Sequence, residues 1–573
     1  MEASSITPRS HSQDRPLRAL SRSATGLLGF CLVVLVLVEI FKESLPFLPL
    51  YLLKTQDIPI LIGLSIALLG GRMIGKNPGV SASLGRVRKA ALNLPMHLII
   101  PLVALIALAG AFGILGAYPL SMDEYWARAD GYALASGQAM GAIPAEFADY
   151  AYAMQPIFSR ISGDATHWAS TYLPLNALFQ GLLGPFASPL FAAGAIWMTV
   201  LVARRHLPEE EALPTISVVL AATSAQWVIT GMTTYAMSAH LFFNMAWLAL
   251  VYRSGTLSQL LAGIVAVIAI GLHQFAFFPI FAGFFVLDLF LSGRRRAAIG
   301  QGVVIMVGVA FWMMWNSLSY KLVGAVPPGG DGRAPVSVTE TVITLLSRND
   351  FSAVGTMGLN LVRFQLWQNP LTLPLMALAI PVAWKLKGFW RACVLSIVAT
   401  IIFMTVIIPY QGHGWGYRYL HQLLGIVTLL AALGWVKLRL DTSNAGRAIF
   451  GAGVLAGLLL LPLRFYQAHS FVQPWAEANK RLSEMEVDIV LVDAPNHLFS
   501  NDLVRNIPME AGGPVRMARA ALTDGQVASL CDRYSVKVFD DGEAAKAGLP
   551  SLDEAIHFDA NSSACSSTDI GER

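Results

Sequence analysis

Long apolar stretches recur along the chain between residues 24 and 464, and they constrain the fold more than any other feature of the sequence. A stretch of roughly 17–25 apolar residues can cross the hydrocarbon core of a bilayer as a helix. In lipid, a helix satisfies its own backbone hydrogen bonds, so such stretches predict an all-α polytopic membrane protein. About thirteen stretches approach this length, namely 24–41, 58–75, 95–117, 187–203, 213–231, 236–252, 257–272, 275–291, 299–320, 371–387, 391–409, 418–437 and 446–464.

The composition agrees with a chain that lies mostly in lipid. Hydrophobic residues make up 55% of the 573 residues and charged residues only 13%, whereas soluble proteins average about 25% charged residues. The net charge of +4 comes without a basic tract, so no nucleic-acid partner is expected. Four cysteines exclude a disulfide-built scaffold. No P-loop, dinucleotide glycine pattern or HExxH helix occurs, so we expect no chemistry driven by a bound nucleotide.

The distribution of basic residues predicts the orientation, because Lys and Arg favour the cytoplasmic side. With the N-terminus inside, more than half of the 40 basic residues fall on short inside loops. The apolar run after residue 23 lacks a small-residue cleavage site, which is typical of a signal anchor. An odd number of spans then places the C-terminus outside. We therefore expect a multi-pass protein of the inner (plasma) membrane with an extracytoplasmic C-terminus.

We expect three parts in the chain. A cytoplasmic arm covers 1–23, a polytopic membrane domain covers 24–465, and an extracytoplasmic domain covers 466–573. The last part has the composition of a soluble domain, and its short apolar runs indicate a small α/β fold. Its predicted elements are a strand at 487–493, a helix at 523–534 and a strand at 536–539, and the outer loops of the membrane domain are 118–170, 321–369 and 410–418.

Two features of these regions stay open. The segment 171–185 is apolar but short, so we expect it to lie at the interface or to re-enter the membrane rather than to span it. Cys531 and Cys565 both fall in the C-terminal domain. In an oxidising compartment they either form a disulfide or remain unpaired, and their spacing does not decide between the two.

Two adjacent carboxylates, Asp123 and Glu124, follow the third predicted span on its outer side. Such carboxylates act as a general base, or hold a substrate hydroxyl or a metal ion. They also suit a helix over 122–136, because Ser121 and Glu124 have the spacing of a capping box and the helix dipole favours acids in the first turn. The two interpretations are compatible, since a cap fixes the carboxylate. Arg128, four residues after Glu124, is expected to pair with it or to bind a phosphate.

The loop 410–418 and the start of the next span are rich in aromatic and basic residues. Its three glycines let the backbone approach a ligand closely. Arg418 lies on the side that basic residues avoid, so we interpret the loop as a phosphate and head-group site with Arg418 as bidentate donor. The alternative is a snorkelling arginine in an aromatic belt. The candidate substrate-binding residues of the chain are Arg128, His413, Tyr417, Arg418 and His421.

The outer Asp-Glu pair belongs to a larger arrangement. It opens the segment DEYWARADGYALASGQ (123–138), which is followed by the Pro-containing piece TYLPLNALFQGLLG (171–184) and by a span that ends in Arg204-Arg205. This arrangement resembles the multi-spanning glycosyltransferases of the C-type fold, among them the protein O-mannosyltransferases and the lipid A aminoarabinose transferase. The pair usually follows the first span of that family, whereas here it follows the third. The arginine close behind the pair in the aminoarabinose enzyme is not matched, because position 126 is Trp.

The resemblance implies an inverting glycosyltransferase that moves a sugar from a polyprenyl-phosphate donor to an extracytoplasmic glycan, lipid or protein acceptor. Asp123 would then be the catalytic carboxylate that deprotonates or orients the acceptor hydroxyl, and Glu124 would assist it. A divalent metal at this pair stays open, and no other cofactor is expected. The competing interpretation is a lipid or solute transporter, which usually shows internal repeats that this sequence lacks. Convergence of Asp123 and Arg418 beside a cavity open to lipid would favour the transferase.

Overall fold

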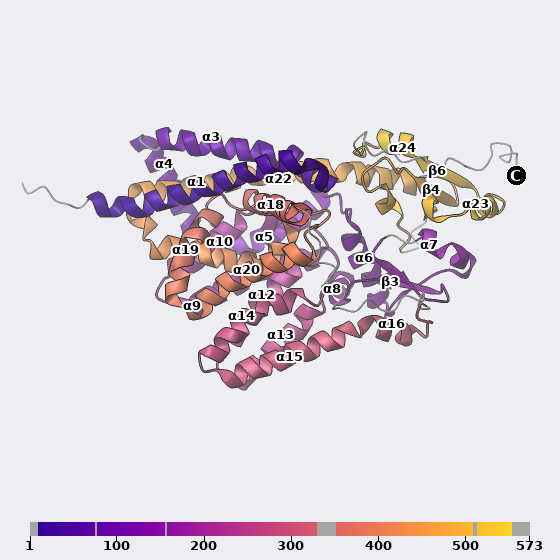
Figure 1. Ribbon diagram of the computed structural model, residues 1–573, viewed down its shortest axis with the longest axis horizontal. Coiled ribbons are helices and arrows are strands. Elements are labelled where there is room, and N and C mark those ends of the chain that lie inside the picture. The colour runs from indigo at the N-terminus through magenta and orange to yellow at the C-terminus, as the bar shows by residue number, and fades with distance from the viewer. Residues whose placement is uncertain (1–9, 75–76, 155–156, 329–350, 508–512, 553–573) are drawn as a thin grey trace, which may run out of the picture.

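Helices that run along one direction make up most of the computed structural model, and two small sheets lie at one end of the bundle (Figure 1). The structure describes residues 10–74, 77–154, 157–328, 351–507 and 513–552. Within these residues, eight helical stretches are long and apolar enough to cross a membrane, and five shorter apolar helices of 10–17 residues accompany them. The chain is an all-α polytopic membrane protein with a small α/β unit near its C-terminus, as predicted.

Every predicted apolar stretch falls on helices of the bundle. The stretch 213–231 is divided into two helices, because the Ser224 hydroxyl accepts a hydrogen bond from the Trp227 amide (3.2 Å) and starts a new helix there. The helices of the membrane part are α1 Ser10–Phe41, α2 Phe47–Leu52, α3 Ile58–Ile74, α4 Pro78–Asn93, α5 Met96–Gly113, α9 Ala187–His206, α10 Ala212–Ala222, α11 Ala225–Thr230, α12 Met237–Val251, α13 Thr256–Ile270, α14 Phe277–Leu291, α15 Arg295–Met313, α16 Trp315–Val323, α18 Phe351–Leu366, α19 Thr372–Leu386, α20 Gly388–Ile407, α21 Leu424–Lys437 and α22 Asn444–Ser483.

Successive turns of the chain alternate between the two ends of the bundle, as the predicted spans require. At one end, Arg205 donates to the Tyr252 carbonyl (2.6 Å), which joins two turns that were both expected inside. At the other end, the Leu173 amide donates to the His273 carbonyl (3.0 Å), which joins two segments that were both expected outside. We call this second end the outer end. That the outer end faces away from the cytoplasm stays a prediction.

The outer end carries a helix pair that positions the candidate site. Helix α6 (Met122–Ala135) begins at Ser121 and ends before Gly137, where the sequence predicted it to start and stop. It crosses α8 (Leu175–Leu183), a short helix of the segment expected to be interfacial. The two backbones touch at paired glycines, because a Cβ on Gly181 would lie 2.1 Å from the Gly131 carbonyl oxygen. Only glycine permits this approach, so the sequence itself sets the crossing point.

A small antiparallel sheet, which the sequence did not predict, covers the helix pair. Its strands are β1 Gly141–Ala142, β2 Ser159–Ile161 and β3 His167–Ser170, in the order β1-β3-β2. The Asp130 carboxylate of α6 accepts a hydrogen bond from the Ser170 amide (3.2 Å), which ties β3 to the helix. The described residues of the loop, 118–154 and 157–170, therefore form a layer over the outer end of the bundle.

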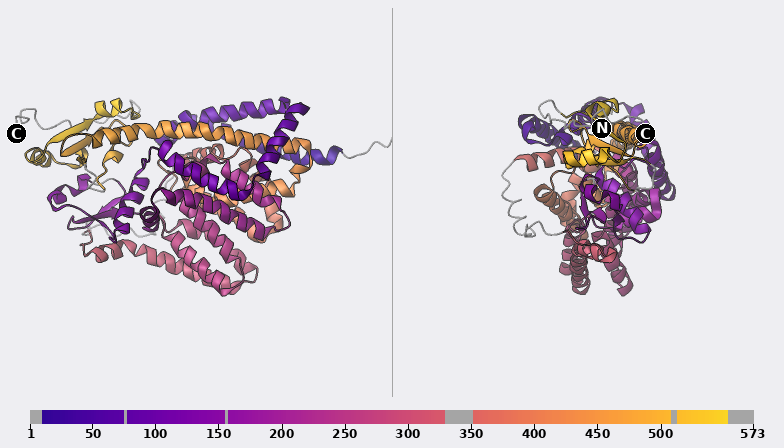
Figure 2. Two further views of the ribbon diagram at one scale, coloured as in Figure 1. Left: turned by 180° about the vertical axis from the view of Figure 1, so that it is seen from behind. Right: turned by 90° about the vertical axis from the view of Figure 1, so that its right-hand side faces the viewer.

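The C-terminal part forms the predicted α/β unit. Both expected strands are present as β4 (Ile489–Asp493) and β6 (Val536–Asp540), and the expected helix is α23 (Asp524–Cys531). A further strand, β5 (Val515–Ala518), completes a parallel sheet in the order β5-β4-β6, and α24 (Asp541–Lys546) follows it. Helix α22, 40 residues long, carries the chain from the bundle into this unit without a break (Figure 2).

Two of the expectations fall partly beyond the described residues. Cys565 lies outside them, so the pairing of Cys531 with Cys565 stays a prediction. The loop 321–369 also lies partly outside them, at residues 329–350. The later part of that loop is helical, because α18 covers Phe351–Leu366.

Candidate active site at the outer end of the bundle

Asp123 and Arg418 form a buried ion pair, although 295 positions separate them in the sequence. Asp123 comes from the first turn of α6, and Arg418 is the first residue of the 3-10 helix η5 (Arg418–Leu423), which leads into α21. Both side chains are more than nine-tenths buried. The fold thus brings together the acidic and basic poles that the sequence placed on two separate outer loops.

Glu124 has a different role from its neighbour, because it caps the helix that carries Asp123. Its carboxylate accepts a hydrogen bond from the Ser121 amide (3.3 Å), and the Ser121 hydroxyl accepts one from the Glu124 amide (3.4 Å). This is the predicted capping box. The other carboxylate oxygen accepts from the Thr234 amide (3.3 Å), and the Thr234 hydroxyl donates to the Glu124 carbonyl (2.9 Å). The cap therefore also fastens α6 to the turn between α11 and α12.

Tyr172 completes the surroundings of Asp123, and its hydroxyl donates a hydrogen bond to that carboxylate. The tyrosine comes from the segment between β3 and α8, directly after the sheet. Its ring stacks on the imidazole of His273, with centroids 4.1 Å apart. Because His273 lies in the turn between α13 and α14, three separate parts of the chain meet at one carboxylate.

Arg418 is held in place on all sides. Its amide donates to the Gln411 side chain (2.8 Å), and its Nε donates to the Gln411 carbonyl (3.0 Å). The guanidinium lies 4.7 Å from the ring centroid of Tyr235 and 5.2 Å from that of Tyr419, at distances that suit cation–π attraction. Gly414 passes so close that a Cβ there would meet the arginine side chain at 3.0 Å. Gly414 thus serves close packing against this arginine.

The two adjacent carboxylates have opposite electrostatic surroundings. Burial raises the pKa of Asp123, but the positive charge of Arg418 and the hydrogen bond from Tyr172 outweigh it and leave the pKa below its ordinary value. Burial raises the pKa of Glu124 to about 7, against the smaller effect of its backbone hydrogen bonds. Burial also lowers the pKa of His273 to about 4, so the ring that stacks on Tyr172 is neutral near pH 7.

Arg128 lies elsewhere than the sequence suggested. Its guanidinium donates to the Ala117 carbonyl (2.8 Å). The ion pair expected between Glu124 and Arg128 is not formed, since the Glu124 carboxylate faces the backbone amides described above. A helix terminus that uses its acidic residue as a cap leaves that residue unable to reach the next turn.

The other predicted residues of the glycine-rich loop are buried around Arg418 rather than exposed to solvent. His413 packs against the ring of Phe499 in the C-terminal unit, with centroids 4.2 Å apart. His421 lies beside Trp227, with centroids 6.5 Å apart. Among the described residues, no group hydrogen-bonds the ring nitrogens of either histidine or the hydroxyl of Tyr417.

A second buried ion cluster supports the same loop. Asp57 pairs with both Arg363 and Arg464, at 3.1 Å each, and the indole of Trp367 donates to it (2.9 Å). Arg363 also donates to the Gly414 carbonyl (3.3 Å), which joins this cluster to the loop. Arg363 therefore serves the architecture of the site.

Sequence reasoning missed three of these residues: Tyr172, Asp57 and Arg464. The last two flank the predicted spans 58–75 and 446–464 on their outer sides. An ionisable residue at the end of a span is costly unless it is paired, so one acid and one base in such places could have been matched. Nothing in the sequence around Tyr172 distinguishes it from an interfacial tyrosine.

The described residues offer no ready cation site. Among them, no three His, Cys, Asp or Glu side chains lie close enough together to hold a metal ion. Asp123 and Glu124 do not converge, because one faces Arg418 and Tyr172 while the other faces backbone amides. The residues present do not fit a metal held between these two carboxylates.

An apolar groove of about 710 Å³ lies between α14 and α20. Its lining includes Phe284, Leu287 and Ile402, and the last two are among the exposed large hydrophobic side chains. At the outer end of α14, the ring of Phe277 lies 5.8 Å from that of Tyr419, which in turn faces the guanidinium of the site. The lipid-facing groove therefore lies along a helix that contacts η5, the element that carries Arg418.

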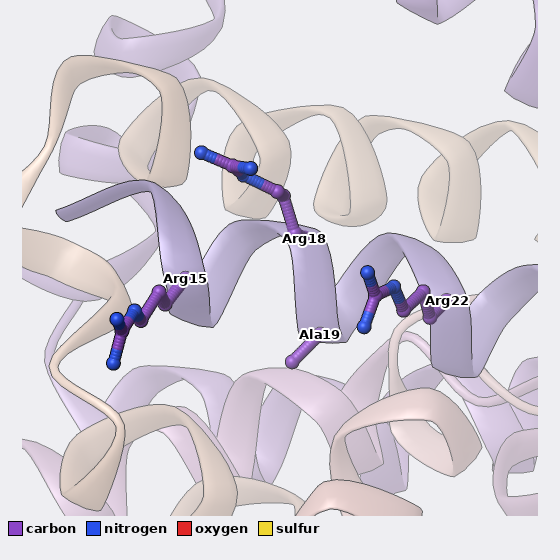
Figure 3. A pocket seen from close by; sticks show the side chains of 4 residues that line it. All are labelled: Arg15, Arg18, Ala19 and Arg22. Atoms are coloured by element: carbon purple, nitrogen blue, oxygen red, sulfur yellow. The ribbon is translucent and has the colours of Figure 1, made fainter. Parts of the chain in front are cut away.

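A basic hollow of about 520 Å³ lies on the N-terminal part of α1 (Figure 3). It is lined by Arg15, Arg18, Ala19 and Arg22, and the three arginines are exposed. This part of α1 projects at the end of the bundle opposite to α6 and the sheets (Figure 1). The hollow is thus separate from the candidate site and belongs to the end that the basic residues predict to be cytoplasmic.

Comparisons with known proteins give likenesses of fold. No protein-family model matches the chain, and the comparison with curated proteins finds no match. The solved structure of ArnT from Cupriavidus metallidurans bound to undecaprenyl phosphate is similar, with 12% identity and a TM-score of 0.46 over 71% of this chain and 83% of that one. The apo structure of the same protein gives 11% identity and a TM-score of 0.45, over 73% and 84%.

Proposed function

We propose that the protein is a membrane glycosyltransferase that moves a sugar from a polyprenyl-phosphate donor to an extracytoplasmic acceptor. The observation that carries this proposal is the buried pair of Asp123 and Arg418 at the outer end. Transfer from a phosphate-linked sugar needs a carboxylate at the acceptor oxygen and a cation at the leaving phosphate. This pair supplies both groups in one place, and burial strengthens the interactions of each.

In the proposed reaction, the acceptor hydroxyl oxygen attacks the anomeric carbon while the bond from that carbon to the phosphate oxygen breaks. The phosphate leaves with the bonding electrons, and Asp123 takes the hydroxyl proton. A single displacement of this kind inverts the anomeric centre. Tyr172 and the cap at Glu124 act as positioning residues, since one fixes the carboxylate and the other fixes the helix that carries it.

The ion pair also gives a reason for the order of events. While Arg418 neutralises Asp123, the carboxylate is a weak base, because its pKa lies below the ordinary value. A donor phosphate that engages the guanidinium would draw its positive charge away from the carboxylate. The pKa of Asp123 would then rise toward the range in which it accepts a proton. Donor binding would thus prepare the base for the acceptor.

The groove between α14 and α20 is the place we propose for the polyprenyl chain. It is apolar, about 710 Å³ in volume and bordered by exposed hydrophobic side chains. Its two helices adjoin the segment that carries Arg418, so a chain lying in the groove could present its phosphate to the guanidinium. No desolvation of polar groups opposes such binding, because apolar surface meets apolar surface.

The test is replacement of Asp123 with Asn in the full-length protein. A deletion strain complemented with the wild-type gene should contain a glycosylated envelope component that the strain carrying Asp123→Asn lacks or makes about 10²–10⁴-fold more slowly. Mass spectrometry of envelope glycans, lipids and proteins gives this readout. Membrane insertion and abundance of the variant should equal those of the wild type.

The matched control is Asp164→Asn, which alters an exposed carboxylate of the same outer loop. This variant should support the wild-type product level. Full product from Asp123→Asn would remove the carboxylate from the mechanism. A deletion that changes only the distribution of a compound across the membrane, and no covalent linkage, would replace the transferase with a transporter.

A further inference from the structure

A second hollow, of about 780 Å³, lies where the C-terminal unit meets α6. Its walls come from the turn after α5, from α6, from the outer part of α22 and from residues 505–507. Three tyrosines line it, namely Tyr118, Tyr125 and Tyr132, and we call it the tyrosine hollow. It begins near the end of a predicted span, so it opens at the level of the membrane surface.

The tyrosine hollow is not part of the site around Asp123. An α-helix turns 100° per residue, so Tyr125, Arg128 and Tyr132 lie about 140–200° around α6 from Asp123. The carboxylate faces Tyr172 and the bundle, whereas these three side chains face the hollow. A ligand in the hollow would therefore meet the opposite face of the helix.

One wall of the hollow contains a buried polar atom that lacks a partner. The hydroxyl of Tyr118 makes no hydrogen bond with any described residue, although the side chain is more than nine-tenths buried. Such an atom costs free energy unless something binds it. The guanidinium of Arg505 lies 4.3 Å from the ring centroid of Tyr118, and it is fixed there because it donates to the Leu120 carbonyl (3.0 Å). A fixed cation thus lies over the ring that carries the unpartnered hydroxyl.

The lining carries more positive than negative charge, with Arg128, Lys480 and Arg505 against Glu477. Glu477 pairs with Arg481 outside the hollow (3.2 Å), which offsets its charge. Lys480 has only an exposed contact with Glu484 at 3.9 Å, and such surface pairs contribute little. The net positive charge selects an anion, and cations from three directions suit the several oxygens of a phosphate better than a planar carboxylate.

We propose that the tyrosine hollow binds a phosphate ester, carried either by a free sugar or by a lipid head group. The ester oxygens would accept hydrogen bonds from the Tyr118 hydroxyl and from Arg505, with Arg128 and Lys480 closing the open side. This site is independent of the proposed transfer reaction, because it uses no residue of the Asp123 pair. It would anchor an anionic molecule at the junction of the bundle and the C-terminal unit.

The test is a binding titration with the full-length protein in nanodiscs of zwitterionic phosphatidylcholine. Glucose 1-phosphate is the soluble probe, and nanodiscs that contain phosphatidylglycerol form the lipid arm, read as a rise in thermal stability. Lys480→Gln and Tyr118→Phe should each weaken the response at least threefold, and Glu477→Gln should strengthen it. Lys546→Gln is the control, since Lys546 (67% exposed) matches Lys480 (66% exposed) but lies on α24.

The arms separate the two sources of the phosphate. A response to glucose 1-phosphate that falls in the two weakening variants supports a soluble sugar phosphate, and the same pattern with phosphatidylglycerol alone supports a lipid head group. Equal effects of Lys480→Gln and Lys546→Gln, or no response in either arm, would overturn the proposal. Asp123→Asn should bind the probe as the wild type does, so failure of the transferase proposal leaves this result unchanged.

Discussion

Asp123 and Glu124 are neighbours in the sequence and have different tasks in the fold. The first carboxylate is ionised beside a guanidinium, and the second is a buried helix cap whose pKa is raised to about 7. An α-helix places consecutive side chains 100° apart, so adjacent residues meet different surroundings. Residue types alone indicate that two carboxylates matter, and only their surroundings assign the roles.

The raised pKa of Glu124 predicts how stability depends on pH. Between its ordinary value of 4.5 and about 7, the folded protein holds a proton that the unfolded chain has released, so stability falls as pH rises through this window. The full difference amounts to about 3 kcal/mol for this buried group. Thermal unfolding in detergent at pH 5 and pH 8 measures the effect, and Glu124→Gln should reduce the loss.

Glu124→Gln should remove only part of the loss of stability between pH 5 and pH 8. Burial also raises the pKa of Asp130 to about 6, so this carboxyl lowers stability over the same range of rising pH. The control is Glu146→Gln, which changes an exposed carboxyl of the same outer layer. Its stability should depend on pH as that of the wild type does. A Glu124→Gln variant with the full wild-type loss between the two pH values would exclude the cap as a source of the effect.

At the scale of elements, the crossing of α6 and α8 decides where the candidate base lies. Gly131 and Gly181 let the two backbones touch, and the segment before α8 then delivers Tyr172 to Asp123. The sequence predicts the first helix from its capping box, and it predicts that the segment of the second lies at the interface or re-enters the membrane. It does not predict their contact, because a glycine in a helix also serves other purposes and its partner is 50 positions away.

A side chain at position 181 should therefore loosen the site. Gly181→Ala places a Cβ 2.1 Å from the Gly131 carbonyl oxygen, so the helices must separate. Overpacking of this kind costs about 1–3 kcal/mol. We expect a lower unfolding temperature in detergent and a loss of the product formed in the complementation assay.

The control for this variant is Gly300→Ala in α15, where an added Cβ would meet nothing within 4 Å. Alanine is the better helix former by about 1 kcal/mol, so this change should be neutral or stabilising. Equal behaviour of the two variants would mean that the α6–α8 contact does not hold the site together.

At the scale of the whole molecule, the alternation of spans gathers the outer loops at one end. The segments that carry Asp123, Tyr172, His273 and Arg418 are separate in the sequence, with Tyr172 49 positions and Arg418 295 positions from Asp123, yet all precede or follow spans that end on the same side. The charge bias predicted which segments share a side, and the contacts between them agree. Which end of the bundle faces the cytoplasm is predicted from the basic residues alone.

Labelling in intact cells measures this orientation. With the bundle oriented as predicted, a membrane-impermeant maleimide should react with Glu146→Cys without permeabilisation and with Ser254→Cys only after it. Both positions are exposed, one in the outer layer and the other in the turn between α12 and α13. The free cysteines Cys31 and Cys393 are buried and should give little background, and the protein without an added cysteine measures any labelling of Cys531 and Cys565. The reverse labelling pattern would invert the topology.

The sequence by itself determined the membrane class, the approximate spans, the helix at 122–135 with its cap and most of the C-terminal sheet. These features follow from local periodicity and from the fixed thickness of a bilayer. Only the tertiary structure decided that Arg418 meets Asp123, that Tyr172 joins them and that Asp57 gathers two arginines behind the glycine loop. Those contacts depend on how helices cross and on which of their faces meet. The periodicity of a sequence shows which face of a helix is buried, but it does not show which other element packs against that face.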